Sequence, residues 1–97
     1  MPTYVSLINW TEKGIAEFKS TVDRAEAGKV LAAGFGGALK DIYWTLGPYD
    51  IVVVSEAPDD ETAMAFALSL SSQGNVRTTT LRAFSGDEMR SIIAKAG

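Results

Sequence analysis

The chain has 97 residues, of which 46% are apolar and 22% charged, a composition typical of one small globular domain and unlike that of disordered or fibrous chains. Its formal net charge is -3 and its basic residues are spread along the chain, so neither nucleic acid nor a membrane is expected as a partner. Cysteine and histidine are both missing, which excludes a thiolate nucleophile, a Ser-His-Asp triad and the usual zinc and non-haem iron sites.

The N-terminal segment predicts a strand followed by a short helix. Residues 3–9 are short and rich in β-branched and aromatic side chains, and both faces of this stretch are largely apolar, so we expect a central strand. Thr11 is a suitable helix cap, and Glu12 in the first turn suits the helix dipole. The apolar face of this helix is predicted to consist of Ile15, Phe18 and Val22.

A second helix is predicted from Thr21 to about residue 35. Thr21 is its expected N-cap, and the glycine-rich residues 34–37 are expected to end it. These glycines resemble a phosphate-binding loop only superficially, because they follow a helix and do not join a strand to a helix. The buried side of the helix is predicted to consist of Ala27, Leu31 and Phe35.

The middle of the chain predicts a hairpin of two strands. Residues 38–46 alternate in polarity, which is typical of a half-exposed edge strand. Residues 47–50 form a turn with Pro48 at its second position. Residues 51–54 are apolar on both faces and predict an inner strand that is covered on both sides.

The C-terminal part predicts a helix, a strand and a final helix. Asp59 is the expected cap of the first helix, whose buried stripe comprises Ala63, Phe66, Ala67 and Leu70. Residues 76–84 form a threonine-rich strand that suits a sheet edge or a wet surface. Residues 85–88 form a capping box before the last helix, whose apolar stripe comprises Met89, Ile92, Ile93 and Ala96.

The order of the elements predicts an α+β fold in one domain, residues 1–97. It divides into two β-α-β halves, the pattern of a ferredoxin-like antiparallel sheet with its two main helices on one face. From the right-handed crossover rule we place the first and third strands in the middle, parallel to each other. The other sheet face is apolar at its centre and needs a cover, for which a second copy of the chain is the simplest choice. We therefore expect a homodimer or a higher homo-oligomer. A cytoplasmic location is also expected, because residues 1–4 do not begin a secretory signal.

Four stretches of the chain are distinctive: Asn9-Trp10-Thr11, Gly47-Pro48-Tyr49-Asp50, Glu56-Ala57-Pro58-Asp59-Asp60 and residues 75–84. Together they resemble the GYD domain family, and the resemblance covers nearly the whole sequence. It is most specific at the turn and at the threonine-rich strand, and Val22 departs from it where a proline is expected. The resemblance implies a dimeric α/β barrel of two ferredoxin-like sheets packed face to face, with no established biochemical function. Separately, no cofactor is expected.

Four residues are candidates for a site near the strand ends. Asp50 and Tyr49 could act as an acid-base pair, although Asp50 more simply accepts backbone N–H bonds within the turn while Tyr49 packs. Asn9 and Trp10 end a central strand, where a tryptophan can stack on a ligand or simply cover the entry of the helix.

Further candidates lie along the strands. Tyr43 could hold a ligand through its hydroxyl or pack against its cross-strand neighbour. Glu56 needs a charged partner or a raised pKa if it is buried, and Arg82 or Arg77 could supply that partner within or between subunits. Residues 78–80, three threonines, suit strand formation and interface hydrogen bonds, and alternatively could line a polar pocket.

Two hypotheses of function follow. The first is a dimer that binds a small, partly apolar molecule without catalysis, because the residue types of most catalytic sites are missing. The second is cofactor-free oxygenation or isomerisation of a small aromatic or enol, with Tyr43, Asp50 or Glu56 handling the proton and Trp10 stacking the substrate. Haem chemistry is less expected because no histidine can serve as its axial ligand.

Overall fold

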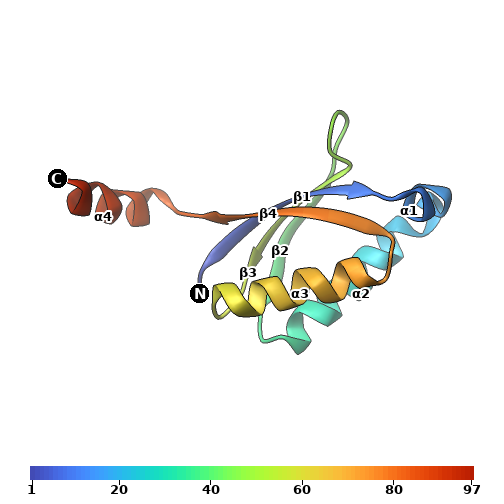
Figure 1. The fold of residues 1–97 in the computed structure, drawn as a ribbon, viewed down its shortest axis with the longest axis horizontal. Helices are drawn as coiled ribbons and strands as arrows, with labels where there is room; N and C mark the ends of the chain where they lie inside the picture. Colours follow the sequence, from blue (N-terminus) through green and yellow to red (C-terminus); the bar gives the residue numbers. More distant parts are fainter.

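The structure is a computed structural model that describes residues 1–97 and has the α+β, ferredoxin-like fold predicted from the sequence (Figure 1). Its elements are β1 (Thr3–Trp10), α1 (Glu12–Ala16), the 3₁₀ turn η1 (Phe18–Ser20), α2 (Thr21–Gly34), β2 (Ala38–Trp44), β3 (Ile51–Glu56), α3 (Asp60–Ser72), β4 (Val76–Ala83) and α4 (Gly86–Ala96).

The four strands form one sheet in the order β2-β3-β1-β4. The central position of β1 and β3 and the edge positions of β2 and β4 are confirmed. The predicted parallel pairing of β1 with β3 is wrong, because these strands are antiparallel. Each crossover helix joins two strands of the same direction, and another strand of opposite direction lies between them in the sheet.

Helices α2 and α3 cover one face of the sheet (Figure 1). Tyr4, Ser6 and Ile8 of β1 point toward these helices, as the period-2 alternation requires. The core there is small, and its centre is Ile8, Ile51 and Val53, each at most 8% exposed. Partly buried apolar side chains surround this centre: Trp10, Leu39, Ile42 and Val76.

No element of the chain covers the opposite face of the sheet, which we call the open face. The pairing register places alternate residues of all four strands on it. Its apolar side chains are Val5, Leu7, Tyr43, Val52, Val54 and Leu81. Tyr43 is 59% exposed and Leu81 is 48% exposed, so a substantial apolar surface remains in contact with water.

The first two helices differ from the expectation in their buried faces. Thr11 caps α1 as predicted, accepting a hydrogen bond from the Gly14 N–H at 3.1 Å. However, α1 is only five residues long, and the predicted stripe Ile15, Phe18 and Val22 is about half exposed. The chain turns into η1 before these side chains can align on one helical face.

Helix α2 packs through its small residues. Ser20 is its N-cap in place of Thr21, without a side-chain bond, and the buried positions are Gly28 and Ala32. Ala27, predicted to be buried, is exposed. Small residues at a spacing of four allow the helix to approach the sheet closely, so the buried stripe follows size rather than hydrophobicity.

Strand β2 contains a β-bulge between Leu39 and Asp41. The extra residue shifts the alternation by one, so Leu39 and Ile42 both face the helices. The sequence pattern placed these two residues on opposite faces. The bulge leaves Lys40 on the open face together with Asp41.

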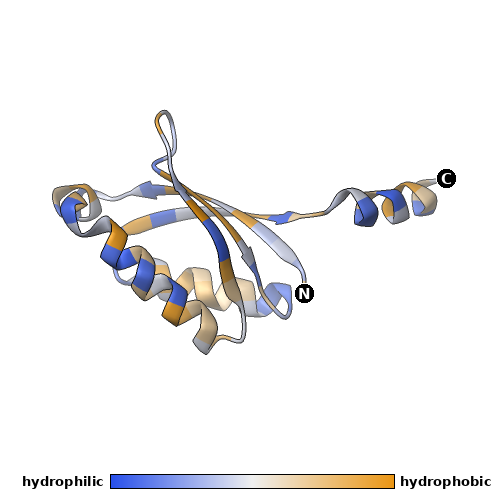
Figure 2. Cartoon of the chain, turned by 180° about the vertical axis from the view of Figure 1, so that it is seen from behind, coloured by the Kyte–Doolittle hydropathy of each residue, from blue (hydrophilic) through white to orange (hydrophobic).

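Helix α4 extends away from the body of the molecule as an arm (Figure 1). The predicted capping box is confirmed, with Ser85 and Glu88 bonded reciprocally. Apolar and polar segments alternate along the helix (Figure 2), and Met89 and Ile93 of the predicted stripe are 47% and 58% exposed. None of the helices has the length and apolar content that crossing a membrane requires.

Candidate ligand-binding site

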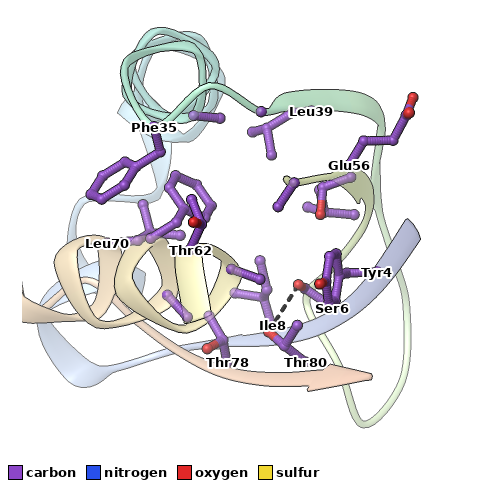
Figure 3. Close-up of a pocket in the computed structure, with 18 residues that line it drawn as sticks. Tyr4, Ser6, Ile8, Phe35, Leu39, Glu56, Thr62, Leu70, Thr78 and Thr80 are labelled. Atoms are coloured by element: carbon purple, nitrogen blue, oxygen red, sulfur yellow. Dashed lines mark hydrogen bonds between the residues drawn. The ribbon is translucent and has the colours of Figure 1, made fainter. Parts of the chain in front are cut away.

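A cleft with a volume of about 50 Å³ lies between the sheet and helices α2 and α3 (Figure 3). Its sheet side is formed by alternate residues of β1, β3 and β4, and its helix side by the buried stripe of α3 and the end of α2. The main residues are Tyr4, Ser6, Ile8, Val53, Thr78 and Thr80 from the sheet and Phe35, Ala63, Phe66, Ala67 and Leu70 from the helical layer. The predicted buried stripe of α3 is therefore the helical wall of the cleft.

The cleft combines apolar walls with a few hydroxyl groups. Phe35 and Phe66 meet edge to face, with ring centroids 6.0 Å apart and an angle of 74° between the rings. Ser6 and Thr80 share a hydrogen bond of 3.0 Å across β1 and β4 (Figure 3). Such a mixture suits a small ligand that is largely apolar and carries one or two polar groups.

Tyr4 closes one end of the cleft as a neutral hydrogen-bond donor. Its side chain is buried, and its hydroxyl donates to the Asp60 carboxylate at 2.6 Å. Burial and the hydrogen bond to Asp60 raise the pKa of Tyr4 to about 12. The phenol therefore keeps its proton at neutral pH and anchors α3 to β1, and it is a poor base.

A second cavity, of about 80 Å³, adjoins the cleft toward the C-terminal end of β1. The two share Ile8, Leu39, Val53 and Leu70 as common walls. The polar residues of the second cavity come from three different parts of the chain, namely Trp10 of β1, Thr21 and Arg24 of α2, and Gln73 and Asn75 after α3.

The structure separates the residues that the sequence suggested near the strand ends. Trp10 lines the second cavity, whereas Asn9 lies on the open face opposite Arg77 of β4. The Asp50 carboxylate accepts the backbone N–H of Trp10 at 2.9 Å. Bonding of this carboxylate within its own turn was therefore the wrong expectation, and the carboxylate instead ties the β2–β3 loop to β1.

The strand candidates do not place their polar groups in the cleft, although Glu56 belongs to its rim. Tyr43 is on the open face, and the Glu56 side chain points away from the cleft (Figure 3). Glu56 pairs with Lys40 at 3.4 Å, and not with Arg82 or Arg77. The β-bulge explains this pairing, because it brings Lys40 to the face on which Glu56 lies.

Arg82 makes several contacts around the end of β4. Its guanidinium lies 4.4 Å from the Phe84 ring centroid and 5.8 Å from that of Tyr4. It also donates to the carbonyl of Thr3 at 3.3 Å and pairs with Glu88 of α4 at 3.6 Å. Arg82 therefore connects the sheet with the first turn of the α4 arm.

Sequence reasoning identified the α3 stripe but did not select several cleft residues. Of the three threonines, Thr78 and Thr80 line the cleft and Thr79 faces the other way, as the strand alternation requires. Tyr4 and Arg24 were missed as site residues. A tyrosine on the helix-facing side of a central strand was the available signal for Tyr4, whereas Arg24 carried none. No cluster of three or more acidic side chains is placed to hold a metal ion.

The fold and the cleft define a small ferredoxin-like α+β protein with an apolar pocket between sheet and helices. A model of the GYD domain matches residues 4–93, and the chain belongs to the GYD domain family. The resemblance noted in the sequence is thereby confirmed.

A relative from Thermus thermophilus is named glutamine synthetase and cystathionine beta-lyase binding protein. It is 38% identical over 84 residues, which are 86% of this chain and 88% of the relative. The crystal structure of TTHA0845, also from Thermus thermophilus, has a TM-score of 0.58 and 26% identity, covering 89% of this chain and 96% of that one.

The crystal structure of MtbAldR has a TM-score of 0.68 at 14% identity, over 87% of this chain. This chain covers 52% of MtbAldR. At this level of identity, the likeness concerns the fold alone.

Proposed function

We propose that this chain is a homodimeric binding protein that holds a small, partly apolar molecule in its sheet–helix cleft and performs no chemical step. The observation that carries the proposal is the lining of the cleft, with aromatic and aliphatic walls and the hydroxyls of Ser6, Thr78 and Thr80. A pocket with a few polar groups among apolar walls is the usual form of a small-molecule site.

The open face supports the dimer. Apolar side chains from four neighbouring strands lie on it uncovered, and such a continuous apolar surface usually marks an interface. A second copy covers the face by the same contacts on both subunits. This gives the face-to-face barrel that the family resemblance implies.

Val54 provides a test of this interface because it lies on β3, in the middle of the open face. Val54→Lys places a charge there and is expected to shift the protein from dimer to monomer in sedimentation equilibrium. Lys95→Val, on the α4 arm, is the control and keeps the dimer. If the unmodified protein sediments as a monomer at micromolar concentration, the face-to-face dimer is wrong.

The ligand is tested separately by native mass spectrometry of freshly purified protein. We expect a bound small molecule, or saturable binding of apolar probes such as short alcohols. Leu70→Trp, which fills the cleft from α3, is expected to abolish binding. Leu68→Trp is the matched control on the exposed side of the same helix. Equal binding by both variants would refute the cleft as the site.

The geometry favours binding over the enzymatic alternative. A base that acts on an aromatic or enol substrate must face a dry pocket. Tyr43 and Glu56 lie on the open face, and the Asp50 carboxylate is engaged by the Trp10 backbone. If a cofactor-free oxygenase or isomerase activity is found, Tyr43→Phe, Asp50→Asn and Glu56→Gln identify its base.

A protein partner is a second candidate, supported by the printed name of the 38% identical relative and by the α4 arm with its exposed apolar stripe. The partners named for the relative suggest that a metabolic enzyme is the protein that binds the α4 arm. Co-sedimentation with purified glutamine synthetase and cystathionine beta-lyase tests this directly. Ile93→Asp is expected to weaken such a complex, and Arg90→Gln, on the polar side of the arm, is expected to leave it unchanged.

A further inference from the structure

Three residues in the wall of the second cavity each have a buried polar side-chain atom without a hydrogen-bond partner. Three buried side-chain atoms of this chain make no hydrogen bond, namely Trp10 Nε1, Arg24 Nη1 and Asn75 Oδ1. All three belong to residues that line this one cavity. A buried polar group without a partner is costly, so three such groups on residues of one cavity wall are candidates for contacts with a polar ligand.

The three side chains are carried by well-anchored backbone. The backbone N–H of Trp10 donates to the Asp50 carboxylate, and the backbone carbonyl of Asn75 accepts the backbone N–H of Thr11 at 3.1 Å. The Arg24 guanidinium is tied by its other nitrogen, Nη2, which donates to the Gly14 carbonyl at 3.1 Å. The backbone that carries these side chains is therefore fixed before a ligand arrives, which lowers the entropy cost of binding.

The charge at the cavity is positive and only weakly compensated. The nearest carboxylate to Arg24 is that of Glu17, at 3.8 Å, which is longer than a hydrogen bond, and the Glu17 side chain is 60% exposed. An exposed pair of this kind contributes little. The guanidinium therefore retains most of its capacity to bind an anion.

The unpartnered atoms specify complementary ligand groups. The guanidinium of Arg24 and the indole N–H of Trp10 are donors and match the two oxygens of a carboxylate. The Asn75 oxygen is an acceptor and matches a hydroxyl group next to that carboxylate. Ile8, Leu39 and Leu70 line both this cavity and the cleft, where an aliphatic chain finds apolar walls.

We infer that the ligand is a short aliphatic 2-hydroxy acid, with its carboxylate on Arg24 and Trp10 and its hydroxyl on Asn75. This inference rests on the proposed function, and it adds the polar anchor and the chemical class of the ligand. Because the three atoms are closed off from solvent, binding includes a small turn of these side chains toward the cavity. The cleft and the second cavity, of about 50 and 80 Å³, share four wall residues, so we place the chain of the ligand in the cleft and its polar end in the second cavity.

The probes that test the inference are 2-hydroxyhexanoate, hexanoate and 1-hexanol, titrated into ¹⁵N-labelled protein. We expect 2-hydroxyhexanoate to bind with the lowest Kd and to shift the Trp10 indole and Asn75 side-chain amide signals. Hexanoate, without the hydroxyl, is expected to bind more weakly, and hexanol, without the charge, at least about tenfold more weakly than 2-hydroxyhexanoate.

Variants of the anchor sharpen the test. Arg24→Met retains an unbranched stem without charge, and Asn75→Asp introduces a repelling carboxylate. Each is expected to weaken 2-hydroxyhexanoate binding at least about tenfold and to change hexanol binding little. Arg90→Met on the α4 arm, where the arginine is 82% exposed, is the matched control and leaves both affinities unchanged. Circular dichroism identifies any variant that does not fold, and the comparison of probes on the unmodified protein does not depend on the variants.

The outcomes separate this inference from the proposed function. If hexanol binds as tightly as the two acids, the cleft binds small molecules but the carboxylate anchor is wrong. If hexanoate equals 2-hydroxyhexanoate, the hydroxyl contact with Asn75 is refuted. If no probe binds, ordered water alone satisfies the three atoms, and both the inference and the small-molecule function are overturned.

Discussion

Gly14 is the position where a single methyl group is expected to disturb both stability and the second cavity. A Cβ built on Gly14 lies 2.0 Å from the carbonyl oxygen of Asn75, 3.0 Å from its carbonyl carbon and 3.3 Å from Trp10 Cβ. Ordinary van der Waals contact begins at about 3.4 Å. The variant Gly14→Ala therefore requires the backbone after α3 to move by more than about an ångström.

The size of the effect follows from three contributions. Overpacking a fitted position costs about 1–3 kcal/mol, and moving the Asn75 carbonyl weakens its bond with the Thr11 N–H, which contributes about 1 kcal/mol. Alanine recovers up to about 1 kcal/mol of helix propensity in α1. The expected net loss in the free energy of unfolding is about 2 kcal/mol, which corresponds to roughly 10 °C in Tm for a domain of this size.

Urea unfolding followed by circular dichroism measures this loss at one fixed protein concentration, because a dimer makes the midpoint depend on concentration. Gly34→Ala is the matched control. A Cβ on Gly34 meets nothing within 4 Å, so this variant is expected to be neutral or more stable by up to about 0.5 kcal/mol. If Gly14→Ala is as stable as Gly34→Ala, the close approach of α1 to Asn75 is wrong.

Three further predictions concern individual contacts. Tyr4→Phe loses the hydrogen bond to Asp60 and about 1 kcal/mol of stability. Because the pKa of Tyr4 rises to about 12 in the folded protein from its ordinary 10.0, the stabilising effect of its protonated form is complete below pH 10. This stabilisation is lost between pH 10 and about 12. In alkaline unfolding, Tyr4→Phe should therefore show no such loss of stability over this pH range. The Thr62 hydrogen bond lowers the pKa of Asp59 below its ordinary 3.8, so the stability that Asp59 adds to α3 is present above that pH and lost on acidification. Asp59→Ala should lower Tm at neutral pH, whereas Asp59→Ser should retain the cap and lose only the acid dependence; equal Tm values for all three proteins at pH 7 would contradict the cap. Ile8→Ala, in the small core, is expected to cost about 3 kcal/mol in urea unfolding, and a loss below about 1 kcal/mol would show that Ile8 is not at the centre of that core.

The sequence predicted those parts of the fold that depend on neighbouring residues in the chain. Thr11, Asp59 and Ser85 cap the expected helices, and residues 51–54 lie on an inner strand. Each of these features is specified within a few residues by propensity, periodicity or a side-chain-to-backbone bond. The antiparallel pairing of the two central strands was missed because it depends on where the two crossover connections place the four strands in the sheet.

The candidate site was predicted less well, because its residues converge from distant parts of the chain. Of the candidates, Trp10 lines a cavity, whereas Tyr43 and Glu56 lie on the open face. Arg24 looked like a solvated residue of a helix surface. Its place in the wall of the second cavity, which it shares with Trp10 and Asn75, became visible only in the fold.

By itself, the sequence determined the order of the elements, their caps, the central and edge positions of the strands and the residue types available for chemistry. These properties are local, because they follow from the composition and from patterns of period two or close to 3.6. The tertiary structure decided the contacts between residues far apart in the chain, such as the Tyr4–Asp60 hydrogen bond across 56 positions. It also decided the β-bulge that moves Lys40 to Glu56 and brought three residues with unpartnered polar atoms into the wall of one cavity. These features depend on the packing of whole elements, which no short pattern in the chain records.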